Sequence, residues 1–359
     1  MTTLRSDATP APERGLPRAL TIGLGFAAAL LILVLLKEFA GIIGPAFLAL
    51  NLVIAAYPVH RWLRAHGTPS WISATVMLLT VVVFLLAAVA GLVWAVSALI
   101  QELPKYSAEY YAFYQQALDL AAQLGYDQSA LEGLVSRIDP NSVVSFITSF
   151  ASQASGVVGI VTIIVATMIF IVMDTPVFGR RLRKVADTHP QFADAMYAFS
   201  GGVRRYWLVT TVFGLIVAVL DWVAMAVLGV PLAMAWALLS FLTNYIPNVG
   251  FVIGLLPPFA ITLFAKGWQT AVLVVVIYAL LNFVVQSIIQ PRFTGESVGV
   301  TPTVSFLSLL LWGSVLGGVG TLVALPMTLL LKAIVIDVDP KAEWVNALIS
   351  SKASSYTDD

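Results

Sequence analysis

Cysteine is absent from this sequence, and charged residues are scarce. Without a thiol the chain can form no disulfide, no thiolate nucleophile and no cysteine-ligated metal site. Charged residues make up 11% of the 359 residues, whereas soluble domains carry about a quarter. The 19 basic and 19 acidic residues cancel, and no basic helix or basic–aromatic stripe occurs, so nucleic acid is not an expected partner.

Signatures of catalysis are also missing. The histidines His60, His66 and His189 are scattered and lie in loop-like segments. The glycine-rich stretch 313–320 lacks the preceding strand and the Lys-Ser/Thr pair of a phosphate-binding loop. No nucleophile stands in a recognisable pattern with a base. We therefore expect no enzyme activity, no catalytic residue, no metal site and no cofactor.

Long apolar runs dominate the sequence instead. A helix rises about 1.5 Å per residue, so about 20 apolar residues cross a hydrocarbon core of ~30 Å. Runs of about this length or longer lie at 19–36, 39–58, 70–100, 156–173, 207–228, 231–265, 269–289 and 299–336. The runs 231–265 and 299–336 are too long for one crossing, and helix-breaking residues interrupt both. The pattern predicts an all-α polytopic membrane protein with about six full transmembrane helices and two re-entrant helical hairpins of opposite orientation.

Basic residues indicate how these helices are oriented. If both chain ends are cytoplasmic, only Lys37, Lys105, Arg137 and Lys266 among the 19 basic residues lie outside. This distribution follows the positive-inside rule. The resulting parts are a cytoplasmic tail 1–18, transmembrane helices 19–100, an extracytoplasmic amphipathic helical insert 101–155, transmembrane helices 156–228 with a cytoplasmic amphipathic loop 174–206, a transport region 229–336 with hairpins 231–265 and 299–336 around helix 269–289, and a cytoplasmic tail 337–359.

The insert 101–155 is the one sizeable polar segment between the apolar runs. Tyrosines recur there at helical spacing, which favours a helical cap that packs or makes oligomer contacts. A ligand-binding domain is the alternative interpretation. The sequence leaves the role of this insert open.

The first interrupted run breaks at residues 243–250. Pro247 has no amide donor and Gly250 tolerates a turn, so we expect the helix to break there. Broken backbone at membrane depth must be satisfied by protein or water. The polar side chains at this tip are candidates for binding a polar solute: Thr243, Asn244, Tyr245 and Asn248. For the two asparagines, capping of the freed backbone groups is the alternative.

The second interrupted run breaks at residues 312–320. We expect its glycines to allow the turn and the close approach of the two arms: Gly313, Gly317, Gly318 and Gly320. Trp312 and Ser314 are candidate solute contacts, with packing as the alternative for the tryptophan. Between the two runs, Tyr278, Asn282, Gln286 and Gln290 form a polar stripe spaced four residues apart. Asn282 and Gln286 either line the solute pathway or bond helices together.

Two carboxylates are candidates for ion coupling. Asp221 lies inside an apolar run, where an ionisable group is costly and commonly functional. The alternative is a carboxylate that is solvated or ion-paired near the outer headgroups. Glu296 precedes the second interrupted run, and pairing with Arg292 is its alternative role.

The final third of the chain resembles the autoinducer-2 exporter family of bacterial membrane proteins. The motifs that carry the resemblance are Asn244-Tyr245-Ile246-Pro247-Asn248-Val249-Gly250, Gln290-Pro291 followed by Gly295, Val300 and Pro302, and Trp312-Gly313 with Gly317, Gly320 and Pro326. The N-terminal half is similar through Pro45, Pro58, Arg61-Trp62 and Asp174, so the resemblance covers roughly residues 20–337. It implies a homo-oligomer, pentameric in the family, whose hairpins contact the substrate and move like an elevator in the bacterial inner membrane.

The main functional hypothesis is a secondary transporter that exports a small polar molecule, such as an autoinducer-2-like signalling compound, by alternating access of the hairpins. Its partners would be that small molecule, membrane lipid and further copies of the chain. A sodium (cation)/proton antiporter is the alternative, because members of the family are associated with that activity. A membrane scaffold whose insert binds a partner is a third hypothesis.

Overall fold

The structure is a computed structural model, and it describes residues 17–106, 154–247, 249–290, 300–339 and 342–349 together with isolated positions between 108 and 123. Regular structure in these residues is helical, without a strand. The elements are α1 (Arg18–Glu38), α2 (Ala40–Ala65), α3 (Ser70–Glu102), η1 (Leu103–Tyr106), α7 (Ala154–Ala186), α8 (Pro190–Val227), α9 (Ala233–Thr243), α10 (Gly250–Lys266), α11 (Trp268–Asn282), η3 (Phe283–Ile289), α13 (Pro302–Val335) and α14 (Glu343–Ile349).

Membrane-length helices account for most of the fold. Within the described residues, six helices are long and apolar enough to cross a membrane: 40–65, 70–106, 156–175, 190–227, 268–289 and 302–335. The first five coincide with predicted crossings. The sixth is α13, which was predicted to double back. The remaining predicted crossing, 19–36, forms the apolar helix α1, which is not among the six. The regular structure of the described residues is therefore helical throughout, with enough long apolar helices for a multi-pass membrane protein.

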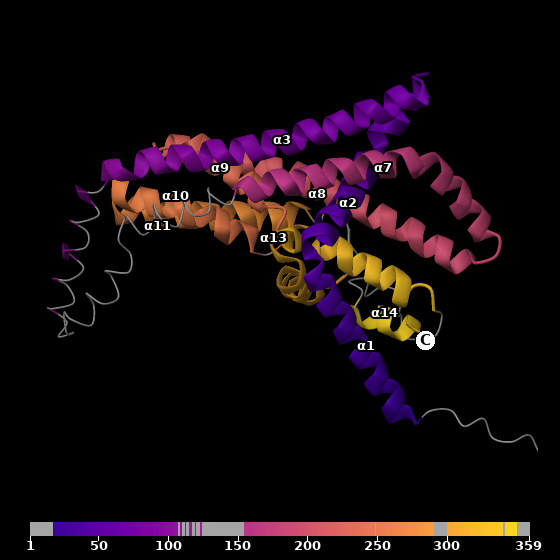
Figure 1. The fold of residues 1–359 in the computed structure, drawn as a ribbon. Helices are drawn as coiled ribbons and strands as arrows, with labels where there is room; N and C mark the ends of the chain where they lie inside the picture. Colours follow the sequence, from indigo (N-terminus) through magenta and orange to yellow (C-terminus); the bar gives the residue numbers. More distant parts are fainter. Residues whose placement is uncertain are drawn as a thin grey trace, which may run out of the picture.

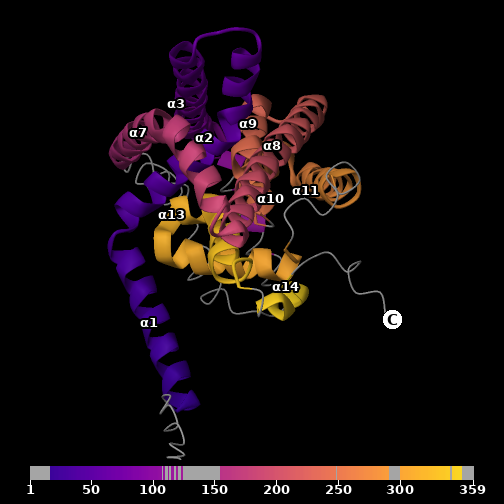
Figure 2. The same cartoon turned by 90° about the vertical axis from the view of Figure 1, so that its right-hand side faces the viewer.

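Three of the long helices run in the same general direction, and three shorter ones gather at one end of them. Figure 1 shows α3, α7 and α8 running lengthwise, with α9, α10 and α11 towards the end where α3 finishes. In both views α1 extends away from the other helices (Figures 1 and 2). The main apolar core is built by residues of α2, α3, α7, α8 and α13.

The predicted cytoplasmic loop 174–206 is largely helical. Helix α7 continues to Ala186, and α8 already begins at Pro190. Proline suits the first turn of a helix, where its missing amide donor has no partner to lose. The hydropathy pattern ended the first helix too early and began the second too late, because their polar turns extend beyond the apolar segments.

The first interrupted run forms two short helices that fold back on each other. Helix α9 has 11 residues and α10 has 17, or about 16 and 25 Å, so neither spans a ~30 Å core. The two helices touch closely, because a Cβ on Gly250 would lie 1.9 Å from the Thr243 carbonyl oxygen. A Cβ on Gly254 would lie 2.8 Å from the Thr243 hydroxyl. Glycine therefore allows the close approach of the arms here, rather than the turn expected at Gly250.

Helix α13 also doubles back, although its hydrogen bonding is nearly continuous. Gly317 has φ 66° and ψ −149°, a conformation that favours glycine. The Trp312 indole donates a 3.0 Å hydrogen bond to the Thr328 hydroxyl, and the Ser308 hydroxyl bonds to the same group. A straight helix would separate residues 312 and 328 by about 24 Å. The break therefore lies at one residue, rather than being spread over 312–320 as predicted.

The other glycines of this second hairpin differ in their roles. A Cβ on Gly320 would lie 2.0 Å from the Trp312 carbonyl oxygen, and a Cβ on Gly313 would lie 3.1 Å from a Thr321 methyl carbon. These two positions allow the arms to approach. A Cβ on Gly318 would meet nothing within 4 Å, so the prediction that Gly318 serves close packing is wrong.

The fold-back of α13 can be tested by cross-linking, because the chain has no native cysteine. We expect the Ser308→Cys/Thr328→Cys double variant to form an intramolecular disulfide on mild oxidation. The pair Ser308→Cys/Thr321→Cys is the control, because Thr321 lies about 10 Å nearer the tip along the returning arm and disulfides need Cα atoms within about 7 Å. Equal cross-linking of both pairs, or of neither, would contradict the geometry.

Candidate functional site

The first hairpin is joined to two neighbouring helices by a chain of amide hydrogen bonds. The Asn244 side chain donates to the Thr210 carbonyl oxygen of α8 at 3.1 Å. Its own oxygen accepts from the Gln286 amide at 2.9 Å, and the same Gln286 nitrogen donates to Asn282 at 2.9 Å. Gly214 on α8 leaves room for this contact, because a Cβ there would lie 2.6 Å from the Asn244 amide nitrogen.

Gln286 lies in a segment of unusual helix geometry. Residues Phe283–Ile289 form a π-helix that continues directly from α11. Such segments are rare, and they are frequent at functional sites. Asn282, just before the segment, donates to the Tyr278 carbonyl oxygen at 2.9 Å. The side chains of Asn282 and Gln286 therefore contact each other, whereas the Tyr278 hydroxyl lies near Asp221.

Tyr245 and Thr243 make contacts that the protein itself satisfies. The Tyr245 carbonyl oxygen accepts from the Tyr206 hydroxyl at 3.0 Å, and its own hydroxyl lies 2.8 Å from that of Thr211. The Trp207 and Tyr245 ring centroids are 5.3 Å apart. Thr243 is buried and donates to the Ser240 carbonyl oxygen. In this conformation these two residues hold the tip in place, whereas Asn244 and Gln286 remain partly exposed.

The second hairpin places its candidate residues differently. Trp312 is buried against Thr328 of the returning arm, as its packing alternative required. The Ser314 hydroxyl donates to the Leu311 carbonyl oxygen at 2.8 Å. The two tips share the main apolar core, since Tyr245 and Trp312 both belong to it. Both hairpins pack against α8, which is the element they have in common.

Several predicted features lie outside the described residues. They include the candidate residues Asn248 and Glu296 and most of the insert 101–155. Their roles stay predictions. Pro247 is described, and it lies in the turn between α9 and α10 as expected.

Asp221 is fully buried, with an exposed fraction of 0%. One carboxylate oxygen accepts a 2.5 Å hydrogen bond from the Ser240 hydroxyl of α9. The other has no partner among the described residues, and neither does the nearby Tyr278 hydroxyl. The alternative interpretation, a carboxylate solvated or ion-paired near the headgroups, is therefore wrong. The ion-coupling prediction remains.

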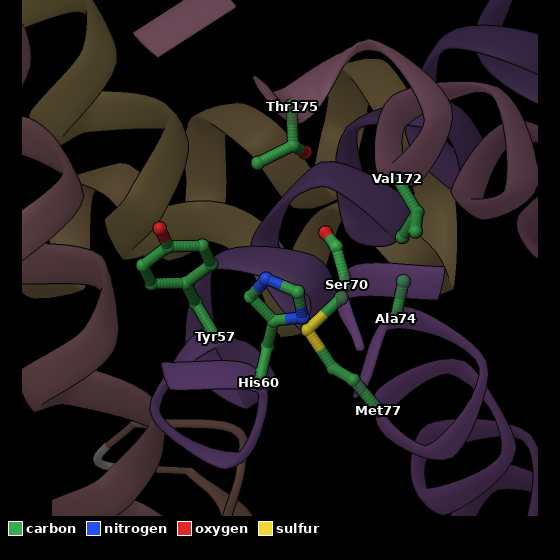
Figure 3. Close-up of a pocket in the computed structure, with 7 residues that line it drawn as sticks. All are labelled: Tyr57, His60, Ser70, Ala74, Met77, Val172 and Thr175. Atoms are coloured by element: carbon green, nitrogen blue, oxygen red, sulfur yellow. The ribbon is translucent and has the colours of Figure 1, made fainter. Parts of the chain in front are cut away.

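A small cavity lies apart from the hairpins, between α2, α3 and α7. Its volume is about 30 Å³, which is enough for a water molecule and too small for an organic solute. Figure 3 shows His60 among the lining residues, which are Tyr57, His60, Ser70, Ala74, Met77, Val172 and Thr175. His60 belongs to helix α2 rather than to a loop, and its buried Nδ1 has no partner in the described part of the chain.

Sequence reasoning missed the partners supplied by α8 and α9. Tyr206, Thr210 and Thr211 on α8 anchor the first tip, and Ser240 on α9 bonds to Asp221. Paired threonines in the middle of an apolar run were a usable signal. Intramembrane hydroxyls commonly hydrogen-bond between helices.

Apolar helices of membrane length around two folded-back helix pairs, with amides gathered at one tip, are the architecture of a polytopic membrane protein. Residues 24–339 match the family model described as the AI-2E family transporter. The chain belongs to this family, so the predicted resemblance is confirmed.

Three relatives span most of the chain. The chain is 29% identical over 293 residues to the AI-2 transport protein TqsA of Escherichia coli (strain K12), and the matched region covers 82% of this chain and 85% of the relative. It is 30% identical over 321 residues to the putative transport protein YhhT of the same strain, with 89% and 90% covered. A putative transport protein of Haemophilus influenzae is 30% identical over 324 residues, with 86% and 90% covered.

The amide chain makes a prediction about stability. We expect the thermal stabilities of Asn244→Ala, Gln286→Ala and the double variant to be non-additive, because the two residues share one hydrogen bond. The coupling free energy should be about 0.6–2 kcal/mol, the range for interhelical hydrogen bonds in membranes. Gln286→Ala combined with the remote Thr80→Ala is the control and should be additive. If the changes in stability are additive in both pairs, the hydrogen bond between Asn244 and Gln286 is contradicted.

Proposed function

We propose that this protein is a secondary transporter that exports a small polar molecule of the autoinducer-2 type. The observation that carries the proposal is the amide cluster of Asn244, Asn282 and Gln286 at the tip of the first hairpin. Side-chain amides both donate and accept hydrogen bonds, which suits a neutral solute rich in hydroxyl groups. The name of the relative TqsA, an AI-2 transport protein, supports the same substrate class.

In the proposed mechanism both hairpins are re-entrant, and they enter the membrane from opposite faces. Paired broken helices of this kind form the midplane binding site in many secondary transporters. The solute forms hydrogen bonds to Gln286 and Asn244, and these replace the hydrogen bond that the two residues make to each other. Binding shifts the protein between inward-open and outward-open states only if these contacts differ between the states.

The first hairpin is the moving element in this proposal, in an elevator-like displacement. Asn248, next to the described tip, joins Asn244 in contacting the solute. Trp312 and Ser314 face the pathway only in a conformation other than this one, because here Trp312 is buried. Gly317, with its positive φ, provides the hinge of the second hairpin.

The surroundings of the transporter complete the proposal. The chain assembles as a homo-oligomer, pentameric by resemblance to the family, in the bacterial inner membrane with both termini in the cytoplasm. Apolar side chains exposed along α1, including Leu24, Phe26 and Leu31, supply a surface for lipid or a further copy. Export of a signalling compound would give the protein a role in quorum sensing.

Efflux from proteoliposomes loaded with autoinducer-2 tests the proposal. We expect Gln286→Ala to slow efflux by about 10-fold or more, since one lost hydrogen bond of about 1.4 kcal/mol corresponds to that factor. Gln269→Ala is the matched control, because Gln269 is exposed at the opposite end of the same helical stretch. If liposomes with the wild-type protein retain autoinducer-2 to the same extent as protein-free liposomes, the function is rejected. Equal efflux rates for Gln286→Ala and Gln269→Ala would reject the site.

A further inference from the structure

A buried carboxyl group links the fixed helix α8 to the first hairpin. Asp221 on α8 is completely enclosed, and its one hydrogen bond runs to Ser240 on α9. Ser240 is itself buried. Gly254 of α10 packs against it, because a Cβ built on Gly254 would lie 3.4 Å from the Ser240 Cα. The carboxyl therefore sits at the joint between α8 and α9, and α10 packs beside the same serine.

Among the residues that the structure describes, no cation pairs with Asp221. The described part of α9 has no titratable side chain, and α11 contributes Tyr278, whose hydroxyl is buried without a partner. Tyr106 of η1 packs against the apolar cluster that contains Met225, Trp236 and Tyr278. Lys266 of α10 lies beside Gly229. Gly229 follows Asp221 by eight residues, which corresponds to about 12 Å at helical rise.

An ionised carboxylate in this place would be very costly. Removing a charge from water without a partner costs many kcal/mol, and a single hydroxyl cannot replace its hydration. Near the C-terminal end of α3, Lys105 forms an ion pair with Glu102 at 2.7 Å, so this lysine is paired with a carboxylate other than Asp221. A neutral, protonated carboxyl group avoids this cost.

We propose that Asp221 is the proton-binding group that couples a proton gradient to movement of the first hairpin. When the carboxyl loses its proton to water, the new charge must be hydrated, so α9 has to separate from α8. When it is protonated again, the joint can close and the apolar cluster around Met225 and Trp236 reforms. One proton is bound and released for each cycle, and the carboxyl O–H bond is the only covalent bond that changes. This inference deepens the proposed transport function and rests on it for the coupling step.

Infrared spectroscopy of the purified protein in lipid tests the proton site without any transport. We expect the wild type at pH 7 to show the carbonyl stretch of a protonated carboxyl group, and Asp221→Asn to lack that band. Asp194→Asn is the matched control, because Asp194 is an exposed carboxylate on the same helix, and it should keep the band. A spectrum that Asp221→Asn leaves unchanged would overturn the proposal.

Transport assays separate the coupling from the pathway. We expect Asp221→Asn to lose autoinducer-2 accumulation driven by an imposed pH gradient by about 5- to 150-fold, the range of typical coupling free energies. Exchange of internal for external autoinducer-2, which needs no net proton movement, should persist, and Asp221→Glu should restore part of the gradient-driven flux.

Two other outcomes have distinct meanings. Equal loss of exchange and gradient-driven flux in Asp221→Asn, with the protein still folded, would make Asp221 structural and overturn the coupling. If the wild type moves no autoinducer-2 in either assay, the proposed function fails and the coupling to it fails with it. The infrared band then still decides whether Asp221 holds a proton.

Discussion

The structure depends on how the broken helices satisfy their backbone. Carbonyl and amide groups freed inside a bilayer must find partners in the protein, since lipid offers none. At the first tip, the Tyr206 hydroxyl on α8 donates to the Tyr245 carbonyl oxygen, and the Ile246 and Gly250 amides bond within the turn. The Asn244 side chain completes the attachment by donating to a backbone oxygen of α8.

Helix α8 thereby becomes the frame of the molecule. It holds the first hairpin at two levels, through Thr210 near its middle and through Asp221 towards its end. It also packs against the second hairpin, which turns sharply at Gly317. In the proposed cycle, a solute replaces the amide contact at the first level, and loss of the Asp221 proton opens the contact at the second.

The sequence predicted the helices and both fold-backs because these follow from local chemistry: apolar length, Pro247 and the glycines near residue 317. It also indicated that Asn244, Asn282 and Gln286 need polar partners, since amides inside apolar runs do, while their contact with a solute stays a prediction. It could not identify those partners on α8, because pairing across more than 30 residues is decided by packing. For the same reason, the burial of Asp221 and the lack of any packing need at Gly318 appeared only in three dimensions.

The central claim is that the first hairpin enters and leaves the membrane on one side. Single cysteines at Pro231 and Lys266, which flank the hairpin in a chain without native thiols, test this directly with a membrane-impermeant thiol reagent in intact cells. The account predicts that both positions are labelled from outside. Labelling of one position from outside and of the other only from the cytoplasm would show that the segment crosses the membrane, and would contradict the account.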